Sequence, residues 1–460
     1  MIIQHFFTPG IAHSSYIVAG NKACAVIDPS RDIGRYIEYA SRNNLKITHI
    51  LETHLHADFV SGHLDLADLT GAPIYAPKSG NCAFPHTPVA EGDRIDLEDI
   101  RFAVIDTAGH TPEHISYIAT DLARGETPVA LFPGDTLFVG DVGRPDLFPG
   151  RAEELASSLY ENLHTKIMTL PGEVEVYPAH GMGSLCGRAM AAKRTSTIGY
   201  EKKYNYALLI KTKEEFINAL TSDMPAAPDH FARCSAINRK GPELMRKLRQ
   251  PVPIEPKDFS EKIKGGALLL DVRSYPAFSG MHIPNAWHID LSGSFATQAG
   301  WVLPPDQEIV LVIEGKQQAE EAALQLRRVG FDTISGFLEG GMLAWGTAAF
   351  PISRVPVISP EEANMLVQSG KATLIDVRSQ EEWDLAHAEK SIHIPWHDLR
   401  TRSTELKEDQ QYIVMCRGGQ RASIAASILK MHDISHVMNL GGGYTAYSRA
   451  GFAPFPLKVK

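Results

Sequence analysis

An internal repeat in the second half of the chain constrains the fold more than any other feature. The segment LLLDVRSYPAF at 268–278 recurs as TLIDVRSQEEW at 373–383. The segment LEGGMLAW at 338–345 recurs as LGGGYTAY at 440–447. Each copy has an apolar, strand-like run before DVRS and a Gly-rich turn near its end. The repeat therefore predicts two tandem α/β domains of the same fold.

Pro-rich segments separate the two copies from their neighbours. QPVPIEPKD precedes the first copy and FPISRVPVISPEE lies between the two, and such segments are typical of turns and linkers. We therefore predict domains at 255–352 and 357–460, preceded by a different domain at 1–250. The chain of 460 residues is long enough for three domains.

Composition excludes several classes of function. The formal net charge of −9 argues against a nucleic-acid partner and against an anionic membrane surface. The first residues lack a basic leader, and no apolar run approaches the roughly 18 residues of a membrane span. The five cysteines are odd in number and widely spaced, which disfavours a disulfide framework. We expect a cytoplasmic protein in a reducing compartment.

Polar residues that can bind a metal ion follow successive predicted strands of the first domain. ACAVIDPS, KITHILETH, VALFPGDTLF and EVEVYPAHG read as strands, and DIGRYIEYASRN and RAEELASSLYENLHTKIM have helical periodicity. The strand ends deliver His54, His56, Asp58, His110, Asp135 and His180. Layered α/β folds usually hold their chemistry at the carboxyl ends of strands. Imidazoles and carboxylates in this arrangement predict a metal site.

This ordered set resembles the metallo-β-lactamase superfold, an αββα sandwich, over about residues 1–250. In two-metal members of that superfold, the resemblance places a second ion between Asp58, a histidine at position 59 and His180, with Asp135 as the bridge. This chain has Phe59 instead. A phenyl ring offers no lone pair to a metal ion, so we expect one metal ion rather than two.

Persulfide dioxygenases within this superfold hold a single Fe(II) with two histidines and one aspartate, and the matching positions are His54, His110 and Asp135. Two imidazoles and a carboxylate on one face leave positions open for O₂ and substrate. The resemblance thus implies one Fe(II) per chain, with zinc as a substituted metal. Three further residues would orient the ligands or a water molecule: His56, Asp58 and His180.

Two residues near these motifs are candidates for substrate binding. Arg144 in GDVGRPDL either holds an anionic substrate or pairs with Asp146, and the sequence favours neither reading. Cys186 follows His180 in AHGMGSLCGRAM. It either lies near the metal ion and relays sulfur or is a plain buried thiol.

The best-defined nucleophile is Cys416, in YIVMCRGGQRASIAASILKM. An apolar strand ends at this cysteine, a six-residue loop runs to Arg421, and a helix follows. Gly418 and Gly419 allow backbone N–H groups to turn toward the sulfur. The helix N-terminus, Arg417 and Arg421 favour the thiolate. The segment 357–460 resembles the rhodanese fold, in which a six-residue loop accompanies sulfur transfer; the alternative is an inert buried cysteine.

The first copy of the repeat lacks this nucleophile. Aligning Trp345 with Tyr447 places Glu314 opposite Cys416 and Ala319 opposite Arg421. A carboxylate cannot carry sulfane sulfur. We therefore interpret residues 255–352 as a catalytically silent rhodanese copy.

The whole chain resembles bacterial persulfide dioxygenase–rhodanese fusions. The resemblance implies an α/β multidomain protein with an N-terminal αββα metallo-β-lactamase sandwich and two tandem α/β rhodanese domains. It implies oxidation of a low-molecular-weight thiol persulfide by O₂ to sulfite, and sulfane-sulfur transfer through Cys416 with thiosulfate or sulfite, for sulfide detoxification. We also expect a homo-oligomer. Two alternatives are a glyoxalase II-like thioester hydrolase, which Phe59 disfavours, and a non-oxidising sulfur carrier or sensor.

Overall fold

The computed structural model describes residues 1–222, 224 and 226–454 of the chain. Their contacts group into two compact units. The first unit comprises Met1–Leu248 with Leu326–Gly330, and the second comprises Arg249–Gln325 with the residues from Phe331 onward. In the described part of the chain, no helix has the length and apolar character needed to cross a membrane.

Two six-stranded sheets form the centre of the first unit. The first sheet has the strand order β1 (Ile2–Thr8), β2 (His13–Ala19), β3 (Ala23–Ile27), β4 (Lys46–Leu51), β5 (Ile74–Pro77) and β6 (Thr87–Val89). The second has the order β12 (Ser196–Thr197), β11 (Glu175–Val176), β10 (Pro128–Phe132), β9 (Ile115–Asp121), β8 (Ile100–Asp106) and β7 (Arg94–Leu97).

Alternation along the strands packs the two sheets face to face. Tyr16 and Val18 of β2 lie in one core with Phe102 and Tyr117 of the second sheet. Ile17, between them in sequence, points to the opposite face. This period of two follows from strand geometry. The inner layer of the unit is therefore a sandwich of two sheets.

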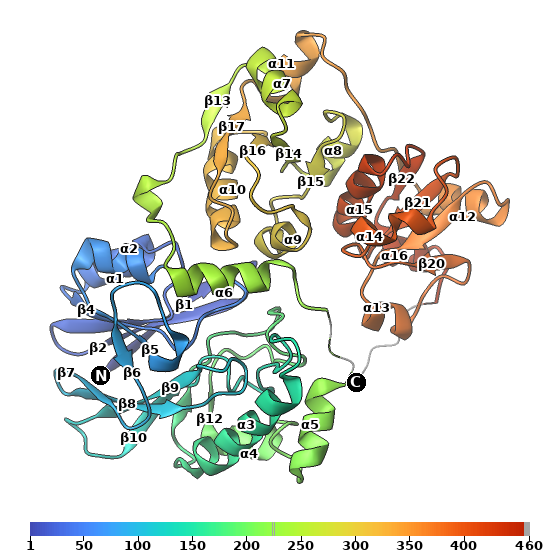
Figure 1. The fold of residues 1–460 in the computed structure, drawn as a ribbon. Coiled ribbons are helices and arrows are strands. Elements are labelled where there is room, and N and C mark those ends of the chain that lie inside the picture. The colour runs from blue at the N-terminus through green and yellow to red at the C-terminus, as the bar shows by residue number, and fades with distance from the viewer. Residues whose placement is uncertain (223, 225, 455–460) are drawn as a thin grey trace. The chain divides into compact units, whose positions relative to one another are not determined.

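Helices cover both outer faces of this sandwich (Figure 1). The helices of the first unit are α1 (Gly34–Arg42), α2 (His63–Thr70), α3 (Ala152–Thr165), α4 (Ile198–Tyr204), α5 (Lys213–Thr221) and α6 (His230–Lys240), with 3-10 turns η1 (Lys78–Gly80), η2 (Ile167–Thr169) and η3 (Met245–Lys247). Tyr36 of α1 and Leu66 of α2 pack on the first sheet. Leu159 of α3 and Phe216 of α5 pack on the second. The predicted αββα sandwich is confirmed.

The second unit contains two five-stranded parallel sheets with equivalent strand orders. One has the order β13 (Val252–Ile254), β17 (Ile334–Leu338), β16 (Ile309–Val312), β14 (Leu268–Asp271) and β15 (Trp287–His288). The other has the order β18 (Val357–Ile358), β22 (Val437–Leu440), β21 (Tyr412–Met415), β19 (Thr373–Asp376) and β20 (Ser391–His393). The identical topology confirms that the sequence repeat is a repeat of the fold.

Helices flank each of these sheets, as parallel strands require crossover connections. Around the first sheet lie α7 (Pro256–Lys264), α8 (Tyr275–Gly280), α9 (Phe295–Val302), α10 (Lys316–Arg328) and α11 (Gly341–Thr347). Around the second lie α12 (Pro360–Gln368), α13 (Gln380–Leu385), α14 (Leu399–Arg402), η4 (Ser403–Glu405), α15 (Gln420–Met431) and α16 (Gly443–Arg449).

The repeated DVR motif is a structural ion pair. The guanidinium Nη2 of Arg273 lies 2.6 Å from Oδ2 of Asp271, and Arg378 pairs with Asp376 at the same distance. In both copies the arginine also donates to a backbone carbonyl eight residues further on. A buried pair of this kind is tolerated because every charge has a partner. The DVR motif therefore has a structural role that is common to both copies.

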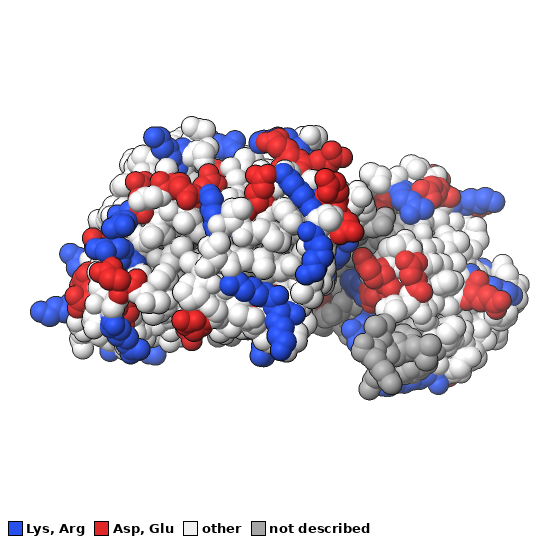
Figure 2. Space-filling model, turned by 90° about the horizontal axis from the view of Figure 1, so that it is seen from below, with Lys and Arg blue, Asp and Glu red and all other residues white. Residues whose placement is uncertain are grey.

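Charged side chains are mixed on the surface. Figure 2 shows Lys and Arg interspersed with Asp and Glu on the face in view. The expected absence of a nucleic-acid or membrane partner stays a prediction.

Candidate functional site

Three of the predicted metal ligands converge in the first unit. His54 follows β4, His110 lies in the loop between β8 and β9, and Asp135 follows β10. All three are buried. Oδ2 of Asp135 lies 3.4 Å from Nε2 of His110 and 3.7 Å from Nε2 of His54. These side chains form one of the groups whose ligand atoms all lie within 4.8 Å of one another.

The ligand atoms of this group are orphaned. In the described part of the chain, His54 Nε2, His110 Nε2 and Asp135 Oδ2 have no hydrogen-bond partner. The other ring nitrogen of each histidine is anchored: His110 Nδ1 donates to the Arg144 carbonyl at 2.8 Å, and His54 Nδ1 lies 2.9 Å from Thr53 Oγ1. Unpaired buried polar atoms are costly. Three such atoms directed at one point are the arrangement expected of a metal-binding site.

Electrostatics gives the group the protonation state that a metal ion requires. Burial lowers the pKa of His110 and holds the pKa of His54 well below its ordinary value. Burial would raise the pKa of Asp135, but the neighbouring His180 and His110 outweigh burial and lower this pKa. The result is two neutral imidazoles and one carboxylate, which are the ligand forms that bind metals.

His180 holds Asp135 in position. Its Nδ1 donates to Oδ1 of Asp135 at 2.7 Å, and its Nε2 lies 2.8 Å from Oδ2 of Asp58. Burial would lower the pKa of His180, but the two carboxylates outweigh burial and raise this pKa well above its ordinary value. Contacts of this kind orient a ligand, and the orienting role of His180 and Asp58 stays a prediction.

His56 contacts a second acidic pair. Its Nε2 lies 3.2 Å from Oδ1 of Asp28, and Asp28, Glu52 and His56 form a separate buried group. Burial raises the pKa of Glu52 to about 8. Sequence reasoning missed Asp28 and Glu52. Both lie at the ends of predicted buried strands, β3 and β4, and that position was the available signal.

Phe59, at the position where the sequence comparison expects a histidine in a two-metal site, is buried beside His56. Its side chain is fully buried and its ring centroid lies 4.4 Å from that of His56. On the other side it contacts His13, which sequence reasoning also missed. Neither ring nitrogen of His13 has a hydrogen-bond partner among the described residues. His13 is the first residue of β2 and forms an isolated bridge with His180.

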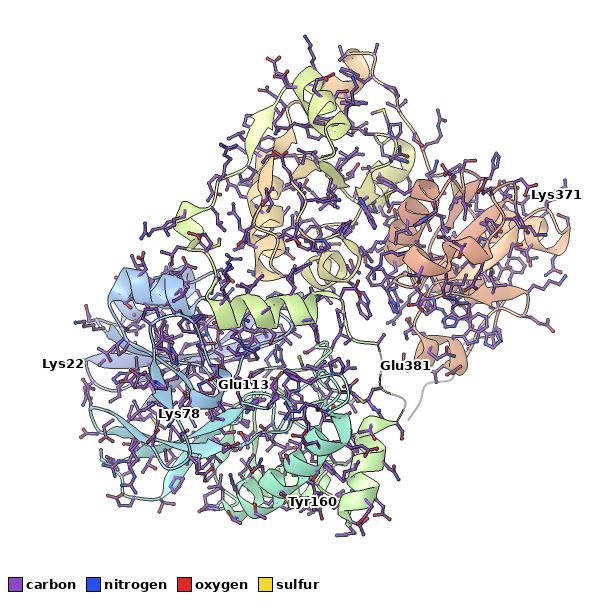
Figure 3. All side chains as sticks on the ribbon, in the orientation of Figure 1. Lys22, Lys78, Glu113, Tyr160, Lys371 and Glu381 are labelled. Atoms are coloured by element: carbon purple, nitrogen blue, oxygen red, sulfur yellow. The ribbon has the colours of Figure 1, made fainter. Side chains whose placement is uncertain are left out.

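Glu113 is a further residue that the sequence did not single out. It is labelled in Figure 3, within the first unit, and its side chain is buried. Its Oε1 accepts the backbone N–H of Leu55 at 3.0 Å. Glu113 thereby fixes the loop that carries His54 and His56.

Cys186 and Arg144 both lie beside the predicted metal site. Cys186 is fully buried, and its Sγ belongs to a group with ligand atoms of Asp58 and His180 within 4.8 Å. Burial and the nearby carboxylates raise the pKa of its thiol well above the ordinary value. Arg144 donates from Nε and Nη2 to the two carboxylate oxygens of Asp146, each at 2.7 Å. The sequence left two roles open for Arg144, binding of an anionic substrate and pairing with Asp146. The structure contains the pairing with Asp146.

In the second unit, Cys416 lies in the predicted loop. β21 ends at Met415 and α15 begins at Gln420. The backbone N–H of Gly419 donates to Sγ of Cys416 at 3.0 Å. Gly419 has φ +116°, a conformation that side chains rarely adopt. Glycine is therefore required for the loop to turn an N–H toward the sulfur.

The two arginines of the loop differ. Arg421 donates to both carboxylate oxygens of Glu382, at 2.5 and 2.9 Å, whereas Arg417 is exposed. The sequence did not identify Glu382. Its only sequence signal is a position close to the DVRS motif, on α13. Both arginines line a pocket of about 710 Å³ that also contains Cys416.

The corresponding loop of the first rhodanese copy has no such geometry. Only Ile313–Gly315 separate β16 from α10, and Glu314 is exposed. The backbone N–H of Glu314 donates to Oε1 of Gln318 at 2.8 Å, so it is directed to a helix side chain. The catalytic silence of this copy stays a prediction, and the shorter loop supports it.

Two family models match the chain. The metallo-beta-lactamase superfamily matches residues 8–180, and the rhodanese-like domain matches residues 255–348 and 359–450. The hydroxyacylglutathione hydrolase of Methylobacillus flagellatus is 35% identical over 157 residues, which are 34% of this chain and 56% of that protein. The chain thus spans little more than half the length of this curated relative.

Solved structures are similar to longer parts of the chain. The crystal structure of ETHE1 from Myxococcus xanthus is 27% identical with a TM-score of 0.46, and covers 52% of this chain and 98% of that one. The crystal structure of a metallo-beta-lactamase from Staphylococcus aureus subsp. aureus COL is 35% identical with a TM-score of 0.66, and covers 74% of this chain and 98% of that one. The chain therefore belongs to the metallo-β-lactamase superfamily and carries two rhodanese-like domains after its metallo-β-lactamase domain.

Proposed function

We propose that this protein oxidises a low-molecular-weight thiol persulfide with O₂ to sulfite at one Fe(II) held by His54, His110 and Asp135. The observation that carries the proposal is the convergence of their three buried, unpartnered ligand atoms. Fe(II) in such a set would supply open positions where O₂ and a sulfur substrate meet. A rhodanese-like domain on the same chain supports sulfur as the substrate element.

The surrounding residues keep the three ligands aimed at one point. Arg144 and Thr53 each bond the far nitrogen of a histidine ligand, and His180 bonds the far oxygen of Asp135. Ligands held in this way need little rearrangement when a metal ion binds. The buried ring of Phe59 supports a single ion, because position 59 offers no ligand atom.

Cys416 transfers sulfane sulfur in the second half of the proposal. The Cys416 thiolate attacks the outer sulfur of thiosulfate, a new S–S bond forms, and sulfite leaves with the electron pair of the broken bond. The Gly419 N–H, 3.0 Å from Sγ, stabilises the anionic sulfur. In reverse, the same step joins sulfane sulfur to sulfite. Sulfite is thus common to both sites, and fusion raises its local concentration.

A second candidate is hydrolysis of a glutathione thioester. The observation in its favour is the name hydroxyacylglutathione hydrolase, which belongs to curated relatives 34–38% identical to this chain. Phe59, in place of the histidine expected in a second metal site, counts against it.

The deciding experiment is O₂ uptake by protein loaded anaerobically with Fe(II) and given glutathione persulfide. We expect uptake with formation of sulfite or thiosulfate, no uptake by zinc-loaded protein, and loss of uptake in His110→Ala. The control His164→Ala, on α3, should behave as the wild type. No uptake of O₂ with any low-molecular-weight persulfide would overturn the oxygenase proposal.

Hydrolysis of a hydroxyacyl thioester of glutathione then tests the second candidate. If the protein is inactive in that assay too, only sulfur relay through Cys416 would be left.

A further inference from the structure

The pocket at Cys416 is built by both rhodanese-like copies. The C-terminal copy contributes Cys416, Arg417, Gly418, Gln420, Arg421, Gly442 and Thr445. The silent copy contributes Tyr275, Gly293, Ser294 and Gln298. A domain without a nucleophile therefore forms one wall of the pocket of another domain.

Direct contacts place this wall against the sulfur-binding loop. Gln420, the first residue of α15, donates from Nε2 to Oγ of Ser292 at 2.8 Å. The ring of Tyr275 packs on Gly419, where an added Cβ would lie 3.0 Å from the ring carbon Cζ. The residue whose N–H contacts Cys416 is therefore itself in contact with the silent copy.

Further contacts join the two copies away from the pocket. The backbone N–H of His288 donates to Oγ of Ser427 at 3.1 Å, and the rings of Trp301 and His397 stack with centroids 4.2 Å apart. Both copies belong to one compact unit. The position of the wall thus does not depend on a single contact.

The size of the pocket indicates an organic ligand. Its volume of about 710 Å³ lies within the range of roughly 300–1,000 Å³ typical of sites for organic molecules. Thiosulfate and sulfite are far smaller. The silent wall therefore borders space that an inorganic sulfur donor does not need.

The chemistry of the lining indicates the class of ligand. The silent wall offers neutral hydrogen-bonding groups: the amide of Gln298, the hydroxyl of Ser294 and the phenol of Tyr275. The C-terminal copy contributes the exposed Arg417 to the same lining. Amide and hydroxyl groups pair with peptide bonds, and a guanidinium pairs with a carboxylate. This combination fits a small, peptide-like thiol that carries amide bonds and a carboxylate.

We propose that the silent rhodanese copy is the specificity wall of the sulfur-transfer pocket, in which Gln298 and Ser294 contact the organic part of a peptide-like thiol. The inference rests on the sulfur-transfer half of the proposed function. The thiol, as its thiolate, attacks the outer sulfur of the Cys416 persulfide. A new S–S bond forms, the bond to Sγ of Cys416 breaks, and its electron pair stays on the Cys416 thiolate. The persulfide product leaves across the silent wall.

Two sulfur acceptors separate the role of the silent copy from the role of Cys416. Thiosulfate serves as the donor, and glutathione or cyanide serves as the acceptor. In Gln298→Ala we expect KM for glutathione to rise about 3- to 10-fold, because one hydrogen bond to the acceptor is lost. The value of kcat should not change. The rate of the cyanide reaction should stay within twofold of the wild-type rate. In Ser294→Trp, whose ring adds bulk to the silent-copy side of the pocket, we expect kcat/KM for glutathione to fall more than about 10-fold. The smaller thiosulfate and cyanide should still reach Cys416, so the cyanide reaction should fall much less.

The matched control is Gln317→Ala, an exposed glutamine on α10 of the same copy that does not line the pocket. It should leave both reactions unchanged. Retained cyanide activity shows that each variant is folded. Equal effects on both acceptors, no effect in either variant, or no saturable transfer from wild-type protein to glutathione would overturn the specificity wall. If the wild-type protein transfers no sulfur from thiosulfate to cyanide, the proposed role of Cys416 itself would be overturned.

Discussion

The ring of Phe59 lies against the ring of His13, with centroids 4.1 Å apart and planes tilted by 40°. Both side chains are fully buried. Around them stand His56 and His180, which already contact carboxylates. An apolar ring thus separates polar groups that could otherwise gather around a second ion. We therefore expect this side chain to limit the site to one metal ion.

Replacing Phe59 with histidine should create a second metal site. The new imidazole would join Asp58 and His180, two groups whose side chains already touch. We expect bound metal, measured by elemental analysis after dialysis, to rise from about one ion per chain toward two. Phe59→Leu removes the ring but supplies no lone pair, and it should stay at one. A wild type that binds two ions tightly, or a Phe59→His protein that stays at one, would contradict this reading.

Thr53 should control metal affinity without touching the metal ion. Its hydroxyl donates to Oδ2 of Asp28 at 2.9 Å and thus presents its lone pairs to Nδ1 of His54, also at 2.9 Å. Thr53→Val keeps the shape and removes this hydrogen bond. We expect metal affinity, measured by competition with a chelator, to fall about 10- to 100-fold. Thr53→Ser keeps the hydroxyl and should remain close to the wild type; equal losses in both variants would exclude this orienting contact.

Installing a cysteine in the silent copy should not restore sulfur transfer. Only three residues separate β16 from α10, and the Glu314 N–H is already bonded to Gln318. A thiolate placed there lacks the N–H that Gly419 gives to Cys416. In a Cys416→Ser background, Glu314→Cys should show no thiosulfate:cyanide activity above Cys416→Ser alone. Measurable turnover would mean that the nucleophile, and not its loop, is what the silent copy lacks.

His282 should make the second unit less stable in acid. Burial lowers its folded-state pKa to about 4, from an ordinary value of 6.5. Between these values the unfolded chain binds the proton more tightly, so stability falls as the pH falls from 6.5 toward 4. From pH 7 to pH 5 the expected loss is about 2 kcal/mol. All five tryptophans lie between residues 287 and 396, so tryptophan fluorescence during urea unfolding reports on this unit.

The matched variant is His282→Asn, whose amide can keep the hydrogen bond that Nδ1 makes to the Phe278 carbonyl at 2.8 Å. This variant has no group that titrates near neutral pH. The difference in unfolding free energy between wild type and variant should therefore shrink or reverse between pH 7 and pH 5. Parallel stability curves would show that His282 does not carry the effect.

Local patterns predicted the elements that carry the candidate sites. The apolar run before His54 is β4, and the run before Cys416 is β21. The glycine at position 419 was interpretable because a positive φ is a backbone property of one residue. The repeat of DVRS predicted two copies of one fold because strand and helix periodicity are local features of the chain.

The partners of these residues were not predictable in the same way. Asp28 beside His56, Glu113 under Leu55 and Tyr275 on Gly419 are contacts between residues 28 to 144 positions apart. No period or spacing records such contacts, because they arise when separate elements pack together.

The sequence by itself determined the order of folds, the candidate metal ligands, the loop of Cys416 and the absence of a cysteine from the matching loop of the first copy. These are properties of residue type and of short-range pattern. Only the tertiary structure decided that His54, His110 and Asp135 leave orphaned atoms at one point, that Phe59 packs on His13, and that the silent copy lines the pocket of Cys416. Packing decides these features, because burial and hydrogen-bond satisfaction depend on all the neighbours of a residue and not on its position along the chain.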